Sequence, residues 1–314
     1  MKKMLLAGAV GTAAAMSGVY LWFFDFACNG RNRRWSAKPK KSPDPETAEG
    51  KAYYERQKRK QETEEIPYED AWLISRDHLK LHARYYPNEN AERIVILCHG
   101  FHGSVSGDFA YILPMLKRDC EILAIDERAH GRSEGKYITY GAKEKLDIYD
   151  WADFIVEKND RNLPVYLFGV SMGAASVLMN ADQEPAGVKG IIADCGYTTM
   201  HDIILDVQKA WYKTPEFPAL NIMAFNCHTF AHFEMKEADA LSAMKNAKLP
   251  VLFFHGSEDH FVKPSHTEKN AAACASKHRT VFVEGAGHAV SSAKDPQLYE
   301  SEVRRFFAET ESEM

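Results

Sequence analysis

The sequence predicts an α/β protein whose sheet is doubly wound and mostly parallel. Continuously apolar runs of strand length recur along the chain, as expected for strands that are buried on both faces of a parallel sheet. Segments with helical patterns separate many of these runs, so strands and helices alternate. The chain has 314 residues, of which 45% are hydrophobic and 26% are charged. This composition is sufficient for one large hydrophobic core.

The first element is an apolar segment, residues 4–24, without a charged side chain. Its length suits a membrane-spanning helix, which needs about 20 apolar residues. Trp22, Phe23 and Phe24 suit an aromatic belt at the membrane interface. A cleaved signal peptide and a buried helix are the alternatives. We expect residues 1–30 to form an N-terminal transmembrane anchor or signal segment that attaches the protein to a membrane.

The charges around this segment bear on localisation. Lys2 and Lys3 precede it, whereas six Lys and Arg residues follow it between residues 31 and 41. The positive-inside rule then leaves most of the chain in the cytoplasm. The six cysteines are scattered, and several fall in strand-like runs where a free thiol behaves as a small hydrophobe. We expect a cytoplasmic domain, and a secreted or cell-surface form after signal cleavage is the alternative.

A polar segment, residues 31–67, follows. It contains Pro39, Pro43 and Pro45 and then a run of mixed charges at helical spacing, which predicts a solvated helix or tether. The remaining residues, 68–314, form the α/β domain. A net charge of −5 offers no general attraction to nucleic acid, whose binding depends on Lys and Arg that neutralise phosphates. We expect no nucleic-acid partner.

The domain opens with a hairpin, formed by AWLIS (71–75) and LKLHARYY (79–86). Six apolar strands are expected after it, and they begin in the runs RIVILCHG, CEILAID, PVYLFGVS, GIIADCG, PVLFFHGSED and TVFVEGAGH. Helices are expected at residues 143–158, 173–180, 265–276 and 297–309. Ligands of such sheets gather at the carboxyl ends of the strands, so the residues after each run are candidates for the functional site.

The run PVYLF is followed by G-V-S-M-G, Gly169 to Gly173, and then by small residues that begin a helix. A G-x-S-x-G sequence between a strand and a helix holds its serine on a sharp, strained turn. The two glycines remove side chains that would collide, and the hydroxyl is left protruding. Ser171 is therefore the candidate nucleophile.

A serine nucleophile needs a base and a carboxylate that orients the base. His288 follows TVFVE and Asp259 follows PVLFF, so the groups occur in the order Ser, Asp, His that is associated with this turn. Glu258 and Asp194 are the alternative acids. We expect Ser171, Asp259 and His288 to be the catalytic residues.

The sequence CHGFHGS supplies a flexible turn after RIVIL. Gly100 lets the backbone swing round, so that the N–H of Phe101 joins that of Met172 as a donor to the oxyanion. His99 and His102 could also act as metal ligands, but no acidic or cysteine cluster joins them. We expect neither a metal nor an organic cofactor.

Five blocks, CHGFHGS, AIDERAHGRSEG, GVSMGA, HGSEDHFV and GAGHA, resemble the α/β-hydrolase superfamily in order and spacing. The resemblance covers residues 71–308 and is greatest to the bacterial branch of monoacylglycerol-lipase-like and serine-aminopeptidase-like proteins. In that branch DERAHGRSEG corresponds to a structural D-x-R-G-H-G-x-S signature, and Ala129 here replaces its first glycine. The resemblance also implies an α/β-hydrolase fold with a helical cap, at about residues 200–248, whose apolar residues either pack on the domain or line an acyl pocket.

These features predict a serine hydrolase that cleaves small-molecule carboxylic esters with small or medium acyl chains through an acyl-enzyme. A second hypothesis is a serine aminopeptidase-like amide hydrolase, in which Glu234, Glu237 and Asp239 of the cap would hold the substrate amine. A third is a membrane-tethered, non-catalytic binding protein that keeps the fold without the reaction.

Overall fold

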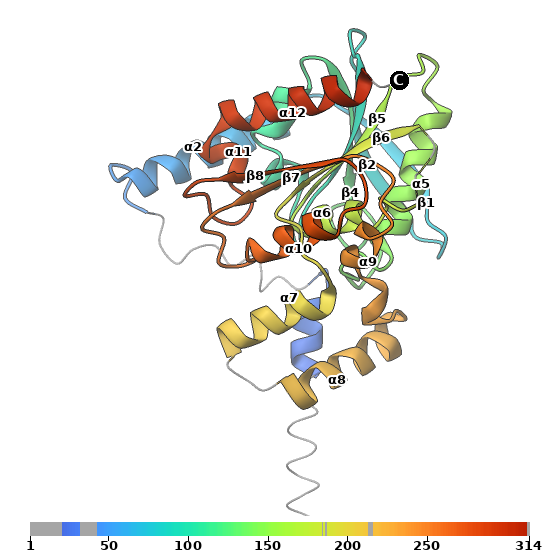
Figure 1. The fold of residues 1–314 in the computed structure, drawn as a ribbon, viewed down its shortest axis with the longest axis vertical. Helices are drawn as coiled ribbons and strands as arrows, with labels where there is room; N and C mark the ends of the chain where they lie inside the picture. The colour runs from blue at the N-terminus through green and yellow to red at the C-terminus, as the bar shows by residue number, and fades with distance from the viewer. Residues whose placement is uncertain (1–20, 32–42, 184, 186, 213–215, 313–314) are drawn as a thin grey trace, which may run out of the picture.

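An eight-stranded sheet forms the centre of the protein. The computed structural model describes residues 21–31, 43–183, 185, 187–212 and 216–312, and its strand order is β1-β2-β4-β3-β5-β6-β7-β8 (Figure 1). β2 is antiparallel to both of its neighbours, and every other neighbouring pair is parallel. The predicted opening hairpin and the mostly parallel sheet are therefore confirmed.

The strands coincide with the apolar runs of the sequence. β3, β5 and β7 are buried along their whole length, which explains why their sequences do not alternate between apolar and polar residues. β8 lies at the sheet edge and is partly exposed. The strands are β1 (Glu69–Ile74), β2 (Lys80–Tyr86), β3 (Arg93–Cys98), β4 (Cys120–Asp126), β5 (Val165–Val170), β6 (Val188–Asp194), β7 (Val251–Gly256) and β8 (His278–Val283).

Helices cover both faces of the sheet. α5 and α6 contribute Trp151 and Val177 to the hydrophobic cluster on one face, and α4 and α12 contribute Leu113 and Val303 to the cluster on the other. The four predicted helices are present, with ends within three residues of those expected. They are α5 (Glu144–Glu157), α6 (Met172–Leu178), α10 (Ser265–Ala273) and α12 (Pro296–Glu311), and the shorter ones are α3 (Val105–Asp108), α4 (Ile112–Leu116) and α11 (Ser291–Lys294).

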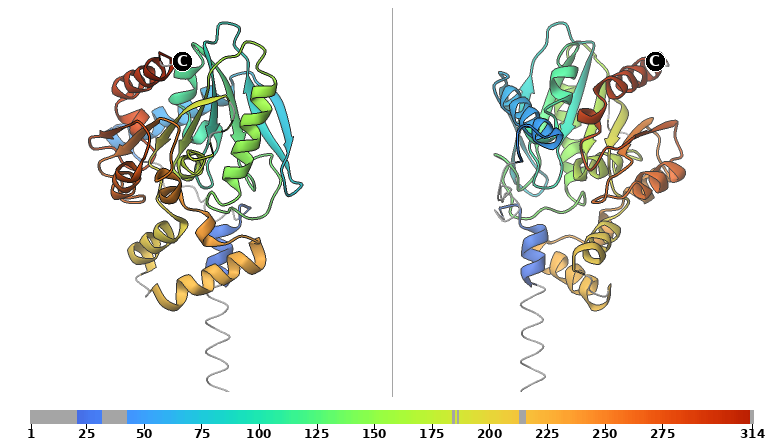
Figure 2. Two further views of the ribbon diagram at one scale, coloured as in Figure 1. Left: turned by 45° about the vertical axis from the view of Figure 1, so that its right-hand side comes forward. Right: turned by 90° about the vertical axis from the view of Figure 1, so that its left-hand side faces the viewer.

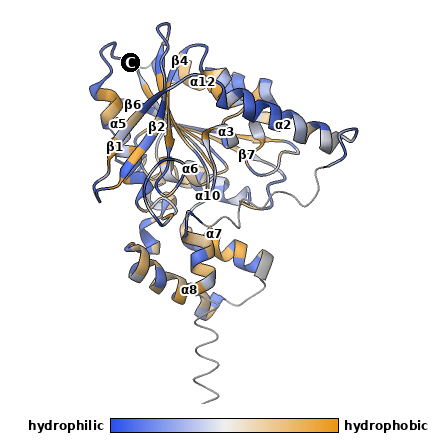
Figure 3. Cartoon of the chain, turned by 180° about the vertical axis from the view of Figure 1, so that it is seen from behind, coloured by the Kyte–Doolittle hydropathy of each residue, from blue (hydrophilic) through white to orange (hydrophobic). Residues whose placement is uncertain are grey.

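A helical excursion between β6 and β7 occupies most of the predicted cap region. It comprises α7 (Met200–Val207), η2 (Gln208–Tyr212), α8 (Glu216–Asn226), η3 (Cys227–Ala231), η4 (Met235–Glu237) and α9 (Ala240–Met244). Figure 3 shows α7 and α8 below the sheet, with hydrophobic residues along both helices. Met223, Phe233 and Met235 are buried in the core, whereas Phe225 is 64% exposed. The apolar residues of this excursion are thus divided between core packing and the surface.

The polar segment contains helix α2 (Ala48–Glu64), which is mostly exposed as expected for a solvated helix. Polar side chains attach it to the domain. Glu64 forms an ion pair with Arg84 at 2.7 Å, and Arg56 donates a hydrogen bond to the carbonyl of Gly107 at 3.3 Å. Residues 48–64 are therefore a helix docked on the α/β domain and not a free tether.

The end of the predicted anchor is helical over residues 21–28, while residues 1–20 lie outside the described residues. Within the described ranges, no helix has both the length and the apolar character that crossing a membrane would need. Trp22 is 43% exposed, but Phe24 is buried at 4% exposure. The assignment of the aromatic cluster to a membrane interface is wrong for Phe24, because its ring packs on Tyr137 inside the protein.

Candidate active site

Ser171 lies at the junction between β5 and α6. Its backbone has φ 56° and ψ −114°, a conformation that residues with a side chain rarely adopt. A Cβ atom at Gly173 would lie 2.0 Å from the carbonyl oxygen of Cys98, and one at Gly169 would lie 2.3 Å from the backbone of Gly173. The two glycines are required because strand, turn and helix approach so closely.

The three predicted catalytic residues lie in one hydrogen-bonded chain. The Oγ atom of Ser171 is 2.9 Å from Nε2 of His288, and Nδ1 of His288 is 2.7 Å from Oδ2 of Asp259. Because an ionised carboxylate only accepts hydrogen bonds, Nδ1 carries the ring proton and donates it to Asp259. Nε2 is then free to accept the hydrogen bond from the Ser171 hydroxyl.

Asp259 is buried and held by several donors. Its Oδ1 atom accepts the amides of Phe261 and Val262, each at 2.9 Å, and its Oδ2 atom lies 3.4 Å from Nε2 of His255. Burial raises the pKa of Asp259, but the hydrogen bonds from His255, His288 and the Phe261 amide outweigh it and leave that pKa well below its ordinary value. Asp259 is therefore a charged partner for His288 at neutral pH.

The two alternative acids have other environments. Asp194 accepts hydrogen bonds from the hydroxyls of Tyr299 at 3.0 Å and Ser291 at 3.2 Å, and burial raises its pKa. Glu258 is exposed to solvent. Within the described ranges, the carboxylate that is hydrogen-bonded to His288 is that of Asp259.

The loop after β3 lies against the nucleophile. A Cβ atom at Gly100 would lie 3.1 Å from that of Ser171, and Phe101 and Met172 line the same pocket as Ser171. Met172 is the first residue of α6, where backbone N–H groups have no acceptor within the helix. Both predicted oxyanion donors therefore belong to residues next to the nucleophile, and their role stays a prediction.

Side chains from elsewhere in the chain accept backbone amides of this loop. Asp108 accepts the amide of Gly100 at 2.8 Å, and no pattern in the sequence marked Asp108. His130, in the DERAHGRSEG block, accepts the amide of His102 through Nε2 at 3.0 Å. The block thus shapes the loop beside Ser171, as its structural role in the family implies.

The substitution within this block has a visible backbone consequence. Ala129 has φ 62°, a left-handed conformation that glycine adopts at little cost and alanine does not. Gly131 follows with φ 49°, and a Cβ atom there would lie 2.4 Å from Oδ2 of Asp126. Ala129 therefore has the left-handed backbone conformation that the family's glycine would adopt, and its backbone is strained.

Cys195, Asp259 and His288 lie close enough to share a metal ion. A cysteine ligand has to be a thiolate, and burial raises the pKa of Cys195 well above its ordinary value. Asp259 and His288 are already hydrogen-bonded to each other. Both ring nitrogens of His99 are hydrogen-bonded to backbone groups. Asp259 and His288 are therefore arranged for proton transfer, and His99 supports the loop. Neither arrangement favours a metal ion.

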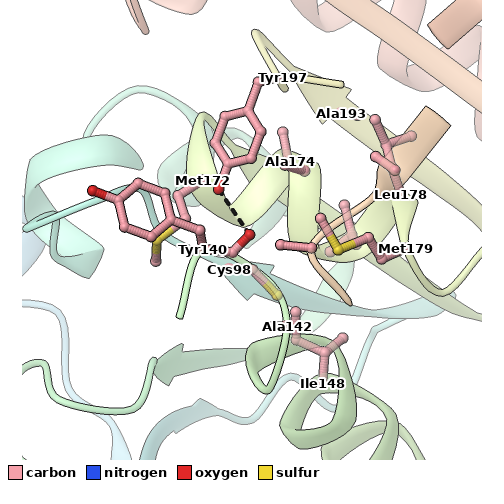
Figure 4. Close-up of a cluster of buried hydrophobic side chains, with 14 of the residues drawn as sticks. Cys98, Tyr140, Ala142, Ile148, Met172, Ala174, Leu178, Met179, Ala193 and Tyr197 are labelled. Carbon is pink, nitrogen blue, oxygen red and sulfur yellow. Dashed lines mark hydrogen bonds between the residues drawn. The ribbon is translucent and has the colours of Figure 1, made fainter. Parts of the chain in front are cut away.

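Ser171 opens on a narrow apolar pocket of about 40 Å³. Figure 4 shows Tyr140, Met172 and Tyr197 close together. Three residues of the N-terminal segment also line the pocket, which sequence reasoning did not predict. The lining consists of Phe23, Phe26, Ala27, Phe101, Tyr140, Ser171, Met172, Tyr197, Ile203, Ile204, Val207, Phe261 and Val262.

The sequence left the apolar residues of the cap either to pack on the domain or to line an acyl pocket, and in the described part of the cap the pocket is lined from α7. The cap contributes Ile203, Ile204 and Val207 of α7. Phe225 and Phe230, in contrast, are among the exposed large hydrophobic residues.

Comparisons with known proteins agree with this architecture. The model of the family described as "Serine aminopeptidase, S33" matches residues 89–221, which include Ser171 and the loop at Gly100. The Bacillus subtilis protein YqkD is 28% identical over 213 residues, which cover 68% of this chain and 70% of YqkD. Rat monoglyceride lipase is 30% identical over 139 residues, which cover 40% of this chain and 43% of the lipase.

The similarity extends to solved structures. The Pyrococcus furiosus esterase Pf2001 superposes with a TM-score of 0.62 at 22% sequence identity, covering 78% of this chain and 90% of the esterase. At this identity the superposition bears on the fold alone. Taken together, the sequence matches and the shared fold make the chain similar to the α/β-hydrolase superfamily.

Proposed function

We propose that the protein is a serine hydrolase that cleaves carboxylic esters with small to medium acyl chains through an acyl-enzyme. One observation carries the proposal. The hydrogen-bonded chain Ser171–His288–Asp259 faces an apolar pocket. A serine hydroxyl is a weak nucleophile at neutral pH, and an adjacent base that is itself oriented by a carboxylate activates it.

The acylation step follows from these positions. Oγ of Ser171 attacks the ester carbonyl carbon while its proton passes to Nε2 of His288, and Asp259 stabilises the imidazolium through Nδ1–H. The backbone N–H groups of Phe101 and Met172 stabilise the oxyanion. As the C–O bond breaks, His288 returns the proton to the leaving alcohol.

Deacylation reverses these roles with water as the nucleophile. His288 takes a proton from the water, the resulting hydroxide attacks the acyl carbon, and the carboxylic acid leaves as Ser171 regains its proton. The name of one relative, monoglyceride lipase, refers to an ester substrate and supports this substrate class.

The amide hydrolase hypothesis lacks comparable support. Glu234 and Glu237 cap the η4 turn reciprocally, and Asp239 accepts the amide of Ser242 at the start of α9. Among the described residues, the lining of the Ser171 pocket contains no carboxylate. A substrate amine would therefore have no charged partner in the pocket, and an uncharged ester fits better.

A fluorophosphonate probe tests the nucleophile directly. It should label the wild type but not Ser171→Ala, and equal labelling of both would overturn the mechanism. A panel of acyl esters and aminoacyl amides then separates the remaining hypotheses. Faster cleavage of aminoacyl amides would favour the amide hydrolase, and tight ligand binding without turnover would favour the binding protein.

We also propose that the N-terminal segment attaches the protein to a membrane, with the domain on the cytoplasmic side. The uncharged sequence of residues 4–20 and the basic residues on either side of it support this. Digestion of the domain by protease added outside intact cells would contradict the orientation.

A further inference from the structure

The N-terminal helical segment, residues 21–28, contributes one wall of the pocket that contains Ser171. Phe23, Phe26 and Ala27 all line the pocket, and residues three and four positions apart lie on one face of a helix. Figure 2 shows this segment below the sheet and beside the cap helices in both views. The opposite walls come from the α/β body and from α7.

The segment is part of the folded domain. The carbonyl of Cys28 accepts the amide of Ile138 at 2.7 Å, and the amide of Gly30 donates to the carbonyl of Lys136 at 3.0 Å. The Tyr140 hydroxyl donates to the carbonyl of Ala27 at 2.9 Å. These three bonds connect the end of the segment and Gly30, just after it, to the chain between β4 and α5, so the pocket wall has a defined position.

Aromatic contacts hold the same segment against the cap. The ring centroids of Phe24 and Phe230 of η3 are 5.9 Å apart. Trp22 stacks on Phe26, with centroids 5.5 Å apart and planes 10° apart. The Phe24–Phe230 contact thus links the segment to the cap, and the Trp22–Phe26 stack lies within the segment itself.

The pocket offers a substrate very little polar contact. The Tyr140 hydroxyl is used by Ala27, and the Tyr197 hydroxyl donates to the carbonyl of Tyr140 at 3.0 Å (Figure 4). In the part of the chain that the structure describes, no charged side chain lines the pocket. Apart from the Ser171 hydroxyl and the proposed oxyanion donors, the walls suit a hydrocarbon chain.

The size of the pocket limits that chain. A volume of about 40 Å³ is small beside ligand pockets of roughly 300–1,000 Å³. Short acyl groups therefore suit this space better than an octanoyl group. Phe23 and Phe26 are the largest side chains of the N-terminal wall.

We propose that Phe23 and Phe26 determine the acyl-chain length that the enzyme accepts and restrict it to short, uncharged acyl esters. This inference rests on the proposed ester hydrolysis and assigns its specificity to a segment outside the family match at residues 89–221. Removal of either ring opens space for further methylene groups. Each methylene that becomes buried favours binding by about fourfold.

The experiment compares kcat/KM for p-nitrophenyl acetate, butyrate and octanoate in the full-length wild type, Phe23→Ala and Phe26→Ala. We expect the octanoate-to-acetate ratio to rise by about tenfold or more in each variant. Leu21→Ala is the matched control, because Leu21 is an apolar residue of the same helix but is 44% exposed. Its ratio should stay at the wild-type value.

Phe26→Leu provides a milder change in case an alanine variant fails to fold, and thermal unfolding identifies such a failure. Its ratio should lie between those of the wild type and a folded Phe26→Ala. The inference is overturned if the wild type hydrolyses these esters and the folded variants keep the wild-type ratio, or if Leu21→Ala shifts it equally. Failure of the proposed function itself looks different, because the wild type would then hydrolyse none of the three esters.

Discussion

Ser171 Oγ and His288 Nε2 lie 2.9 Å apart although 117 positions separate the two residues in the sequence. Ser171 follows β5 and His288 follows β8, and β6 and β7 lie between these strands in the sheet. The loop after β8 therefore has to cross back toward β5. The hydrogen bond between His288 in this loop and Asp259, which follows β7, holds the loop in that position.

Two replacements of Ser171 separate function from backbone strain. Ser171→Ala and Ser171→Gly both remove the nucleophile, and each should lower kcat for ester hydrolysis by about 10⁴-fold or more. Glycine tolerates φ 56° and alanine does not, so the free energy of unfolding should be about 1 kcal/mol higher for Ser171→Gly. Urea unfolding measures this difference. Equal stability of the two variants would contradict the assignment of strain to this position.

Asp259→Asn should lower kcat by about 10⁴-fold and leave KM nearly unchanged. An amide can donate its own proton to Nδ1 of His288, which favours the tautomer that cannot accept a proton from Ser171. Steady-state kinetics with a short-chain ester tests this. Glu258→Gln is the control, because Glu258 is adjacent but exposed. A larger loss of kcat in Glu258→Gln than in Asp259→Asn would show that Asp259 is not the catalytic acid.

Stability should decrease as the pH falls from 7 to 5. Burial lowers the pKa of His130 to about 3 and that of His102 to about 4. The pKa of a histidine in the unfolded chain is about 6.5. The unfolded chain therefore binds more protons below pH 6.5, and the stabilisation that is complete above this pH is lost as the pH falls. Each histidine contributes a slope of up to about 1.4 kcal/mol per pH unit.

Urea unfolding at several pH values measures that slope. It should be shallower in His130→Gln, in which one of these groups no longer titrates. The exposed His260 provides the comparison, and His260→Gln should keep the wild-type slope. An unchanged slope in His130→Gln would show that this ring does not remain neutral in the folded protein.

Gly30→Ala should displace the N-terminal segment. A Cβ atom at Gly30 would lie 2.4 Å from the carbonyl oxygen of Ala129 and 2.6 Å from its Cβ, and overpacking of this kind costs about 1–3 kcal/mol. We expect a lower midpoint of thermal unfolding and a higher octanoate-to-acetate ratio, because Phe26 moves with the segment. If the variant loses stability but keeps its octanoate-to-acetate ratio, the position of this segment does not control the acyl-chain length.

Much of the fold follows from local sequence. The strand β5 and the turn at Ser171 could be predicted because an apolar run, two glycines and a run of small residues are contiguous in the chain. The position of a residue just after a strand also indicates which edge of the sheet it occupies, and Asp259 and His288 were identified on that basis.

Position after a strand favoured Asp259 as the acid but left Asp194 open as an alternative. Asp194 and Asp259 follow adjacent, equally apolar strands, β6 and β7. Their difference lies in their partners, because Tyr299 and Ser291 engage Asp194 while the loop after β8 brings His288 to Asp259. Asp108 is a similar case, since its contact with Gly100 depends on how the loop closes.

By itself, the sequence determined the class of the sheet, the strained turn at Ser171 and the strand ends on which its partners lie, because each of these depends on spacing within a short stretch. Only the tertiary structure decided what surrounds the nucleophile. Phe23 and Phe26 belong to residues 1–30, which the sequence predicts to be an anchor or signal segment. Their place in the pocket arises from backbone hydrogen bonds to a loop that is distant in the chain. Contacts between distant segments depend on the complete fold, and no local pattern encodes them.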